Sequence, residues 1–277
     1  MLRIAIALAC IPAVVACGAV EIIISADPPL PTPNLLRNPG FETITDAGPE
    51  HWSFSTARPD NFALSWEGPA RTGEHCAALT AHTNVMSGYW GQIVPVDAGA
   101  YLLRGHYRLV SGRMLIYAHG TNKDRQPSVG VDERYYAGAL QGHWLVPVFI
   151  PPEALAGMAL DGYEPFRLPV TIPEGLPALT ISLGMYFTPG ELAFDDIWFG
   201  LGETTLTVKI DPQGSTLAGL QVLSDQSDTP VYASEQGQAP PRELTLETMP
   251  TDAVYTVVVT TADGKEFRAT CPEGVDG

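Results

Sequence analysis

Short apolar runs, separated at close intervals by glycine and proline, are the feature that most constrains what this chain can fold into. The sequence holds 27 Gly and 25 Pro, and both residues interrupt helices and favour turns. Apolar and polar side chains alternate in residues 101–108 and again in residues 179–186, which is the period of two that a strand with one buried face produces. We therefore expect an all-β protein made of many short strands joined by turns.

The charge balance disfavours two classes of partner. The chain has 15 Lys and Arg against 31 Asp and Glu, a formal net charge of −16 at pH 7, and no block of basic residues along the sequence. Nucleic-acid binding depends on a basic surface, and electrostatic docking on anionic lipid depends on one too. We therefore expect no nucleic-acid partner and no attachment to a membrane through charge.

The first 16 residues have the features of a signal peptide. Arg3 precedes an apolar run, residues 4–16, that is too short to span a membrane, so we expect export and removal of residues 1–16. The run ends in Val14-Val15-Ala16-Cys17, which resembles a bacterial lipobox and implies an acylated Cys17. The alternative is ordinary cleavage at a nearby alanine, which leaves no anchor. The predicted location is secreted or cell-envelope, with a lipid anchor as the one contact with a membrane.

Residues 17–33 are predicted to be a spacer ahead of the first domain. Four prolines lie between positions 28 and 33, and proline-rich segments are stiff and extended. The apolar residues 20–25 suit a short strand better than a flexible tether.

Two motifs mark the ends of a larger domain over residues 34–201. It opens with Asn-Leu-Leu-Arg-Asn-Pro-Gly-Phe-Glu at residues 34–42 and closes with Phe-Asp-Asp-Ile-Trp-Phe at residues 194–199. Together and in this order they resemble the carbohydrate-binding modules of the family 4/9/22 type, which belong to the galactose-binding-like jelly rolls. The resemblance implies a jelly-roll β-sandwich and a glycan as ligand, although this fold hosts many roles.

The same resemblance implies a structural calcium ion that ties the first strand to the last. Calcium is a hard cation and takes carboxylate and main-chain oxygens as ligands. The positions that match are Glu42 and Asp195, with nearby oxygens from Gly40, Thr72 and Glu74. The alternative is that backbone amides or Arg37 satisfy these carboxylates without a metal, because a buried carboxylate needs some partner.

Sugar recognition needs an aromatic face for the apolar side of a pyranose ring and planar hydrogen-bonding groups for its hydroxyls. Trp52, Trp144 and Trp198 match packing positions of the resembled family, whereas Trp90 follows a glycine-bounded turn where related modules carry a binding aromatic. The candidate ligand-binding residues are Trp90, Tyr117, His119, Tyr186 and Arg104, with His106 as a further candidate. The alternative is that they pack in the core or are solvated polar residues.

No catalytic constellation is recognisable. The sequence lacks a His-Glu-x-x-His zinc motif, a Gly-x-Ser-x-Gly nucleophile elbow and a phosphate-binding loop. Asp195 and Asp196 are adjacent, so in a strand they point to opposite faces and do not form the carboxylate pair of a glycosidase. We expect no catalytic residues and no enzyme activity.

Residues 203–277 are predicted to form a second, smaller all-β domain. Short apolar runs restart there, and Ala262-Asp263-Gly264-Lys265 has the Asp-Gly pair of a tight hairpin turn. About 75 residues in this style suggest an immunoglobulin-like or transthyretin-like sandwich.

These observations support three hypotheses of function. The first is an exported, non-catalytic protein that binds polysaccharide or glycoconjugate by aromatic stacking. The second is a structural or adhesive cell-envelope protein whose sandwich contacts other proteins. The third is an accessory subunit of a polysaccharide-degrading system whose enzyme is a separate chain.

Overall fold

The computed structural model describes residues 13–17, 20–121 and 162–272, and for residues 13–17 and 119–121 it describes strand placement alone. In this part of the chain the one helix is a single 3-10 turn, η1 (Pro59–Asn61), and the rest of the regular structure is antiparallel strand. The predicted all-β class is confirmed. No helix among the described residues is long and apolar enough to cross a membrane.

The chain divides into two compact units, a large unit of residues 34–200 and a small unit of residues 1–33 with 201–277. The strands of the large unit are β3 (Ile44–Thr45), β4 (Gly48–Pro49), β5 (Ser53–Ser55), β6 (Phe62–Glu67), β7 (His75–Ala81), β8 (Gly88–Pro95), β9 (Gly99–Ser111), β10 (Met114–Thr121), β11 (Glu164–Ile172), β12 (Ala178–Met185) and β13 (Gly190–Leu201). Those of the small unit are β1 (Ala13–Cys17), β2 (Val20–Asp27), β14 (Glu203–Asp211), β15 (Leu217–Ser224), β16 (Tyr232–Ala233), β17 (Glu243–Pro250), β18 (Tyr255–Thr261) and β19 (Glu266–Cys271).

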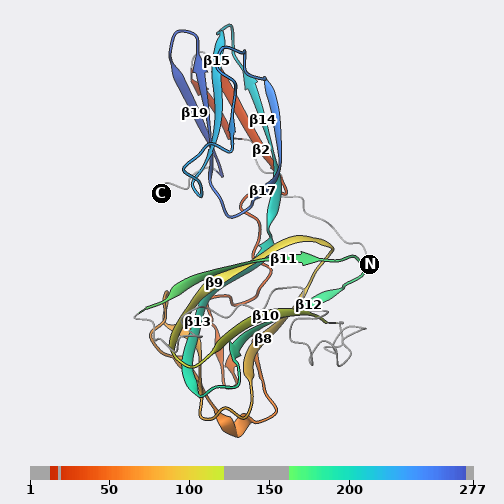
Figure 1. Ribbon diagram of the computed structural model, residues 1–277, viewed down its shortest axis with the longest axis vertical. Helices are drawn as coiled ribbons and strands as arrows, with labels where there is room; N and C mark the ends of the chain where they lie inside the picture. Colours follow the sequence, from red (N-terminus) through yellow and green to blue (C-terminus); the bar gives the residue numbers. More distant parts are fainter. Residues whose placement is uncertain (1–12, 18–19, 122–161, 273–277) are drawn as a thin grey trace. The chain divides into compact units, whose positions relative to one another are not determined.

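The segment before the large unit corrects the predicted spacer. Residues 20–27 form β2, which pairs antiparallel with β14 of the small unit, and Figure 1 shows this red strand in one sheet with blue strands from the other end of the chain. Val20, Ile22 and Ile24 are buried, because alternate apolar residues of a strand are stable only when their face is covered. The large unit is therefore inserted between two strands of the small unit.

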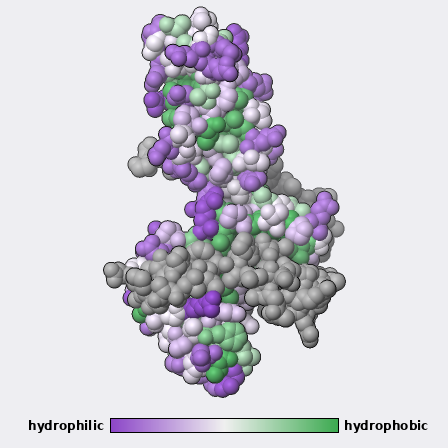
Figure 2. Space-filling model, viewed as in Figure 1, coloured by the Kyte–Doolittle hydropathy of each residue, from purple (hydrophilic) through white to green (hydrophobic). Residues whose placement is uncertain are grey.

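The small unit is a sandwich of two four-stranded sheets, β1-β2-β14-β17 and β16-β15-β18-β19. Apolar residues from both sheets form one core cluster. On the face of this unit seen in Figure 2, hydrophilic and apolar residues are interspersed, as expected for strands with one buried face. The predicted hairpin turn joins β18 to β19, with Gly264 at φ +82° and its N–H bonded to the Thr261 carbonyl.

Strand β1 belongs to the segment predicted to be a signal peptide. It pairs with β2 at the edge of its sheet. Cleavage before Cys17 would remove most of β1 and leave β2 as the edge strand. Signal-peptide cleavage and acylation of Cys17 stay predictions.

The large unit is also a sandwich, and its two sheets face each other in Figure 1. The four-stranded sheet has the order β10-β12-β8-β5, and the five-stranded sheet has the order β11-β9-β13-β7-β6. Neighbouring strands such as β8 and β12 are far apart in the sequence, as a jelly roll requires. Both sheets contribute to the core, for example Leu103 of β9 and Leu183 of β12, which have no exposed surface.

The two motifs behind the family resemblance lie side by side. Leu35 N–H donates to the Phe199 carbonyl at 2.7 Å, and Ile197 N–H donates to the Pro39 carbonyl at 2.9 Å. Asn34 reinforces this pairing, because its side-chain oxygen accepts the Phe199 N–H at 3.0 Å. The opening segment is therefore hydrogen-bonded along the last strand of the sandwich.

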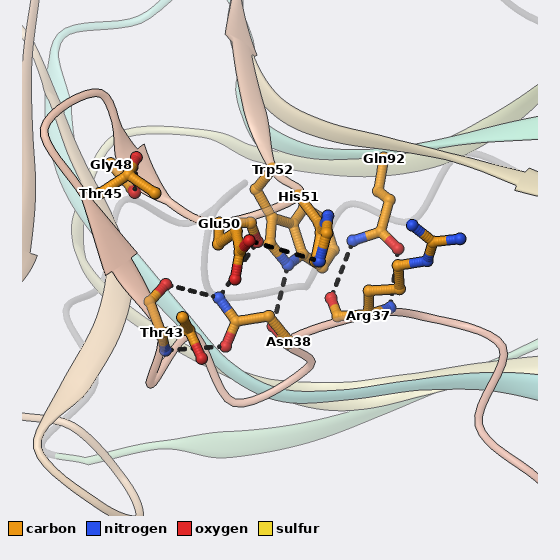
Figure 3. Close-up of polar contacts among 9 residues, drawn as sticks. All are labelled: Arg37, Asn38, Thr43, Thr45, Gly48, Glu50, His51, Trp52 and Gln92. Atoms are coloured by element: carbon orange, nitrogen blue, oxygen red, sulfur yellow. Dashed lines mark hydrogen bonds and ion pairs between the residues drawn. The ribbon is translucent and has the colours of Figure 1, made fainter.

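Asn38 organises the turn that follows the opening segment (Figure 3). Its backbone has φ +48°, a left-handed conformation that asparagine tolerates better than most residues. Its Nδ2 donates to the carbonyls of Thr43 and Glu50 at 2.9 and 3.1 Å, and its carbonyl accepts the Trp52 Nε1–H at 3.0 Å. Trp52 is buried, so the prediction that it packs in the core is confirmed.

Gln92 of β8 fixes the opening segment to the four-stranded sheet. Its side-chain oxygen accepts the Arg37 N–H at 2.8 Å and its Nε2 donates to the Arg37 carbonyl at 2.9 Å, as Figure 3 shows. The Gln92 side chain therefore makes the two backbone hydrogen bonds with Arg37 that a neighbouring strand would otherwise make. These bonds satisfy the side-chain amide of Gln92, which is buried.

Candidate functional site

Trp90 is a core residue, and its assignment as an exposed sugar platform is wrong. Only 1% of its surface is exposed. Its ring lies edge-on to Phe54 with centroids 5.3 Å apart, and its Nε1 donates to the Ala78 carbonyl at 3.4 Å. The physical reason is strand parity, because Trp90 shares the inward face of β8 with Gln92 and the buried Val94.

Four aromatic residues gather on the outer side of the four-stranded sheet. We call Tyr89, Tyr117, Tyr186 and Phe187 the aromatic strip. The rings of Tyr89 in β8 and Tyr117 in β10 meet edge to face at 4.9 Å and 85°, and the rings of Tyr186 and Phe187 meet in the same way at 5.1 Å and 83°. The structure thus brings together two predicted residues, Tyr117 and Tyr186, with two that were not predicted.

Small residues of the intervening strands form the floor beside these rings. β12 lies between β8 and β10, and it places Gly184 opposite Tyr89 and Ser182 opposite both Tyr117 and Gly91. A Cβ on Gly184 would stand 2.5 Å from the Tyr89 ring and 2.1 Å from the Gly88 carbonyl oxygen. Any side chain at position 184 would clash with the Tyr89 ring, so glycine is required for this ring to extend across β12 toward Tyr117.

Phe187 is the most exposed member of the aromatic strip, at 46%. Its backbone has φ +46°, a conformation that is costly for a bulky residue and tends to occur where function requires it. Two hydrogen bonds to the backbone of Arg113 hold the turn that contains Phe187. The Arg113 carbonyl accepts the Tyr186 N–H, and the Arg113 N–H donates to Thr188 Oγ1, both at 2.8 Å. An exposed phenyl ring is therefore displayed from a firmly bonded turn.

A cationic side chain accompanies the strip. The guanidinium carbon of Arg113 lies 5.3 Å from the centre of the Tyr186 ring, within the range of a cation–π contact. Burial raises the pKa of the Tyr89 hydroxyl above its ordinary value, and the nearby hydroxyls of Tyr117 and Tyr186 act in the same direction. The Tyr89 hydroxyl is therefore a neutral hydrogen-bonding group near pH 7.

Tyr89 is the binding candidate that sequence reasoning missed. It precedes Trp90, and the alternation of Trp90 with Gln92 and Val94 was the available signal. Because Val94 must pack in the core, the residue of opposite parity, Tyr89, must point outward.

The remaining predicted ligand residues are not together. Arg104 lies in β9 of the five-stranded sheet, so it belongs to the opposite layer of the sandwich from Tyr117 and Tyr186. His119 lies in β10 opposite Thr180, and its side chain lies outside the described residues, as does all of Trp144. Grouping Arg104 with the tyrosines in one site is therefore wrong, because adjacent β9 and β10 belong to different sheets.

The residues predicted to bind calcium do come together, near the middle of β13 where its pairing with β7 ends. A Cβ on Gly40 would lie 3.9 Å from both Asp195 Oδ1 and the Glu42 side chain. The Glu42 carboxylate accepts the N–H groups of Glu74 and His75 at 3.0–3.2 Å. The opening segment, the middle of β13 and the loop before β7 therefore converge on a set of oxygen atoms.

Backbone amides already satisfy the carboxylate at the centre of this set. Asp195 is fully buried. Its Oδ2 accepts the N–H groups of Arg71 and Thr72 at 2.7 and 3.1 Å, and its Oδ1 accepts that of Asp196 at 2.7 Å. Burial raises the pKa of Asp195 above its ordinary value of 3.8, the three amide bonds oppose this, and the Asp196 charge adds to it.

The donor chemistry of Glu42 and Asp195 suits a hard cation, but their oxygens are engaged by N–H donors. Among the described residues, no group of three or more His, Cys, Asp or Glu side chains is arranged to hold a metal. The geometry agrees with the hydrogen-bonded alternative, and calcium stays a prediction.

Calcium binding predicts a chelator-sensitive melting temperature. If a cation joins Glu42 to Asp195, a chelator should lower the melting temperature and excess calcium should restore it by mass action. Thermal unfolding of the wild type and of Glu42→Gln, with elemental analysis, checks this. An identical transition in chelator, with no metal bound, would leave the amide hydrogen bonds as the full account.

No family model and no curated protein matches the chain, whereas solved structures do. The enzymatically active domain of tailspike protein 4 from bacteriophage CBA120 has 13% identity and a TM-score of 0.43, over 61% of this chain and 21% of that one. A putative sugar-binding protein from Bacteroides thetaiotaomicron has 13% identity and a TM-score of 0.42, over 61% and 100%. The CBM22-1 xylan-binding domain of Paenibacillus barcinonensis Xyn10C has 11% identity and a TM-score of 0.40, over 61% and 95%.

These similar structures include carbohydrate-binding modules, as the sequence resemblance predicted. The identities are low, so the likeness concerns the fold alone. The match spans about a fifth of the tailspike chain.

Proposed function

We propose that this is an exported, non-catalytic protein that binds polysaccharide or glycoconjugate through the aromatic strip. The observation that carries the proposal is the set of aromatic rings on the outer side of one sheet, beside a floor of glycine and serine. Aromatic rings offer apolar faces and edges to a pyranose, and Phe187 and Tyr186 are the members of the strip at the end of β12 where the chain is more exposed.

Two features make Phe187 the principal platform. It is 46% exposed while Tyr117 is 9% exposed, so a sugar ring can reach the phenyl group without moving the core. The neighbouring Arg113 guanidinium presents several N–H donors for hydroxyl groups. Stacking by Phe187 and hydrogen bonding by Arg113 together suit a ligand with one apolar and one polar side.

Replacing Phe187 by alanine is expected to weaken glycan binding by about 1–2 kcal/mol, because one apolar contact face is lost. The melting temperature should stay close to that of the wild type, since an exposed side chain contributes little to stability. Affinity gels containing xylan or galactan, together with thermal unfolding, measure both effects. Val231→Ala removes an apolar side chain of similar exposure from the small unit and should leave binding unchanged.

Two results would count against the proposal. Wild-type protein that binds no glycan on an array would favour the structural or adhesive cell-envelope alternative. Full affinity in both Phe187→Ala and Tyr89→Ala would place glycan binding elsewhere on the molecule.

A further inference from the structure

The outer side of the five-stranded sheet carries a second group of side chains that the aromatic strip does not use. In β9, Leu103, Tyr107 and Leu109 are buried, whereas Arg104 is exposed and His106 and Arg108 are half-buried on the opposite side. Trp198 of the neighbouring strand β13 is also half-buried. We call Arg104, His106, Arg108 and Trp198 the arginine face.

Positive charge is concentrated on this face of an acidic protein. The chain has 15 basic residues against 31 acidic ones, yet Arg104 and Arg108 lie on one strand, and Arg167 of β11 lies opposite Arg104. Within the part of the chain that the structure describes, neither Arg104 nor Arg108 forms an ion pair. Two guanidinium groups on one strand without an acidic partner favour an anionic ligand.

Asp196 of β13 acts electrostatically on His106 and is already engaged by other groups. Asp196 accepts a 2.6 Å hydrogen bond from Arg71 Nη1 and a 2.7 Å hydrogen bond from Thr72 Oγ1. It is therefore not a counter-charge for Arg104 or Arg108.

Trp198 holds one of these cations in place. The Arg104 guanidinium carbon lies 5.0 Å from the centre of the Trp198 ring, which is a cation–π contact. A guanidinium resting on an aromatic ring keeps its N–H edge free, and that planar edge matches a carboxylate in bidentate fashion. The tryptophan thus fixes a carboxylate-binding group before any ligand arrives.

His106 adds a neutral polar group between the two arginines. Burial lowers the pKa of its imidazole, and the neighbouring Arg71 and Arg104 charges act in the same direction, against Asp196. Its Nδ1 is buried without a hydrogen-bond partner among the described residues. A neutral imidazole suits a hydroxyl group rather than a second anion.

We propose that the arginine face is a second binding site, separate from the aromatic strip, which takes an acidic oligosaccharide with carboxylates on Arg104 and Arg108 and a hydroxyl beside His106. Residues four apart on a strand are roughly 13 Å apart. This spacing fits an oligomer with more than one carboxylate better than a single acidic sugar.

Calorimetric titration of the full-length chain with trigalacturonate tests the site, and the fully methyl-esterified trimer is the matched neutral probe. Wild type is expected to bind the acid and not the ester. Arg104→Gln and Arg108→Gln should each weaken binding about tenfold or more, the effect of losing a hydrogen bond to a charged group. Arg242→Gln makes the same change of charge in the small unit and should bind as the wild type does.

Phe187→Ala distinguishes this site from the aromatic strip and should retain full affinity for trigalacturonate. The proposal is overturned if wild type does not bind the acid, if the ester binds equally well, or if both arginine variants keep wild-type affinity. Equal loss in Arg242→Gln or Phe187→Ala would also overturn it. Thermal unfolding of each variant confirms that it is folded.

Discussion

Replacing Trp90 by alanine is expected to lower the free energy of unfolding by about 3–5 kcal/mol, the cost of removing a large aromatic side chain from a core. The ring is 1% exposed and contacts Phe54. It also lies against Gly48, where an added Cβ would stand 3.2 Å from it. Chemical denaturation of wild type and variant measures the change.

Trp90→Phe is the matched variant, because it keeps an aromatic ring in the site and should cost less than the alanine change. Phe187→Ala, which truncates an exposed aromatic residue, should change the free energy of unfolding by no more than about 0.5 kcal/mol. A Trp90→Ala protein with wild-type stability and weakened glycan binding would return Trp90 to the role of a platform.

Replacing Asp195 by alanine is expected to lower the free energy of unfolding by about 2–4 kcal/mol, because three N–H groups lose their acceptor. Those donors belong to Arg71, Thr72 and Asp196, so the loop before β7 would lose its attachment to β13. Denaturant unfolding at neutral pH measures the loss. Asp263→Ala, which removes an exposed carboxylate from the β18–β19 turn, is the control and should cost less.

The pH dependence of the same variant reports the charge state of Asp195. Burial raises its pKa in the folded state above 3.8, so between the two values the folded protein binds the proton more tightly than the unfolded protein. The stability that Asp195 contributes is then full below its unfolded pKa and is partly lost as pH rises through its folded pKa. In metal-free protein the difference between wild type and Asp195→Ala should be larger near pH 4 than near pH 8. A difference that grows with pH would point instead to a bound cation that stabilises the ionised carboxylate.

Strand parity in the sequence is enough to assign Trp90 to the core. The alternation of Trp90, Gln92 and Val94 places all three on one side of β8, and the need to bury Val94 assigns Trp90 to the core. The same argument applied to residues 101–108 separates Arg104 from Leu103. It does not reveal that the outer sides of β9 and β10 belong to opposite layers, because that depends on which strands pair.

The pairing of β2 with β14 does not follow from the sequence pattern of either strand. Residues 20–27 have a strand-like pattern, but their partner β14 lies more than 170 residues away in the sequence. The alternation in one short segment indicates that it forms a strand, but it does not identify the strand with which that segment pairs. The prolines that follow it favoured a spacer for the whole of residues 17–33.

The sequence by itself determined the all-β class, the limits of the large unit and the meeting of Glu42 with Asp195. Period-two alternation is a local property that selects strands, whereas the limits of the large unit and the approach of Glu42 to Asp195 were implied by the resemblance that the two terminal motifs carry. Only the tertiary structure decided that Tyr89 rather than Trp90 faces outward beside Tyr117, that Arg104 rests on Trp198 in the other sheet, and that β2 completes the small unit. Each of these follows from pairing between strands that are distant in the chain. Alternation along one strand defines its two faces, but it does not determine which other strands cover each face.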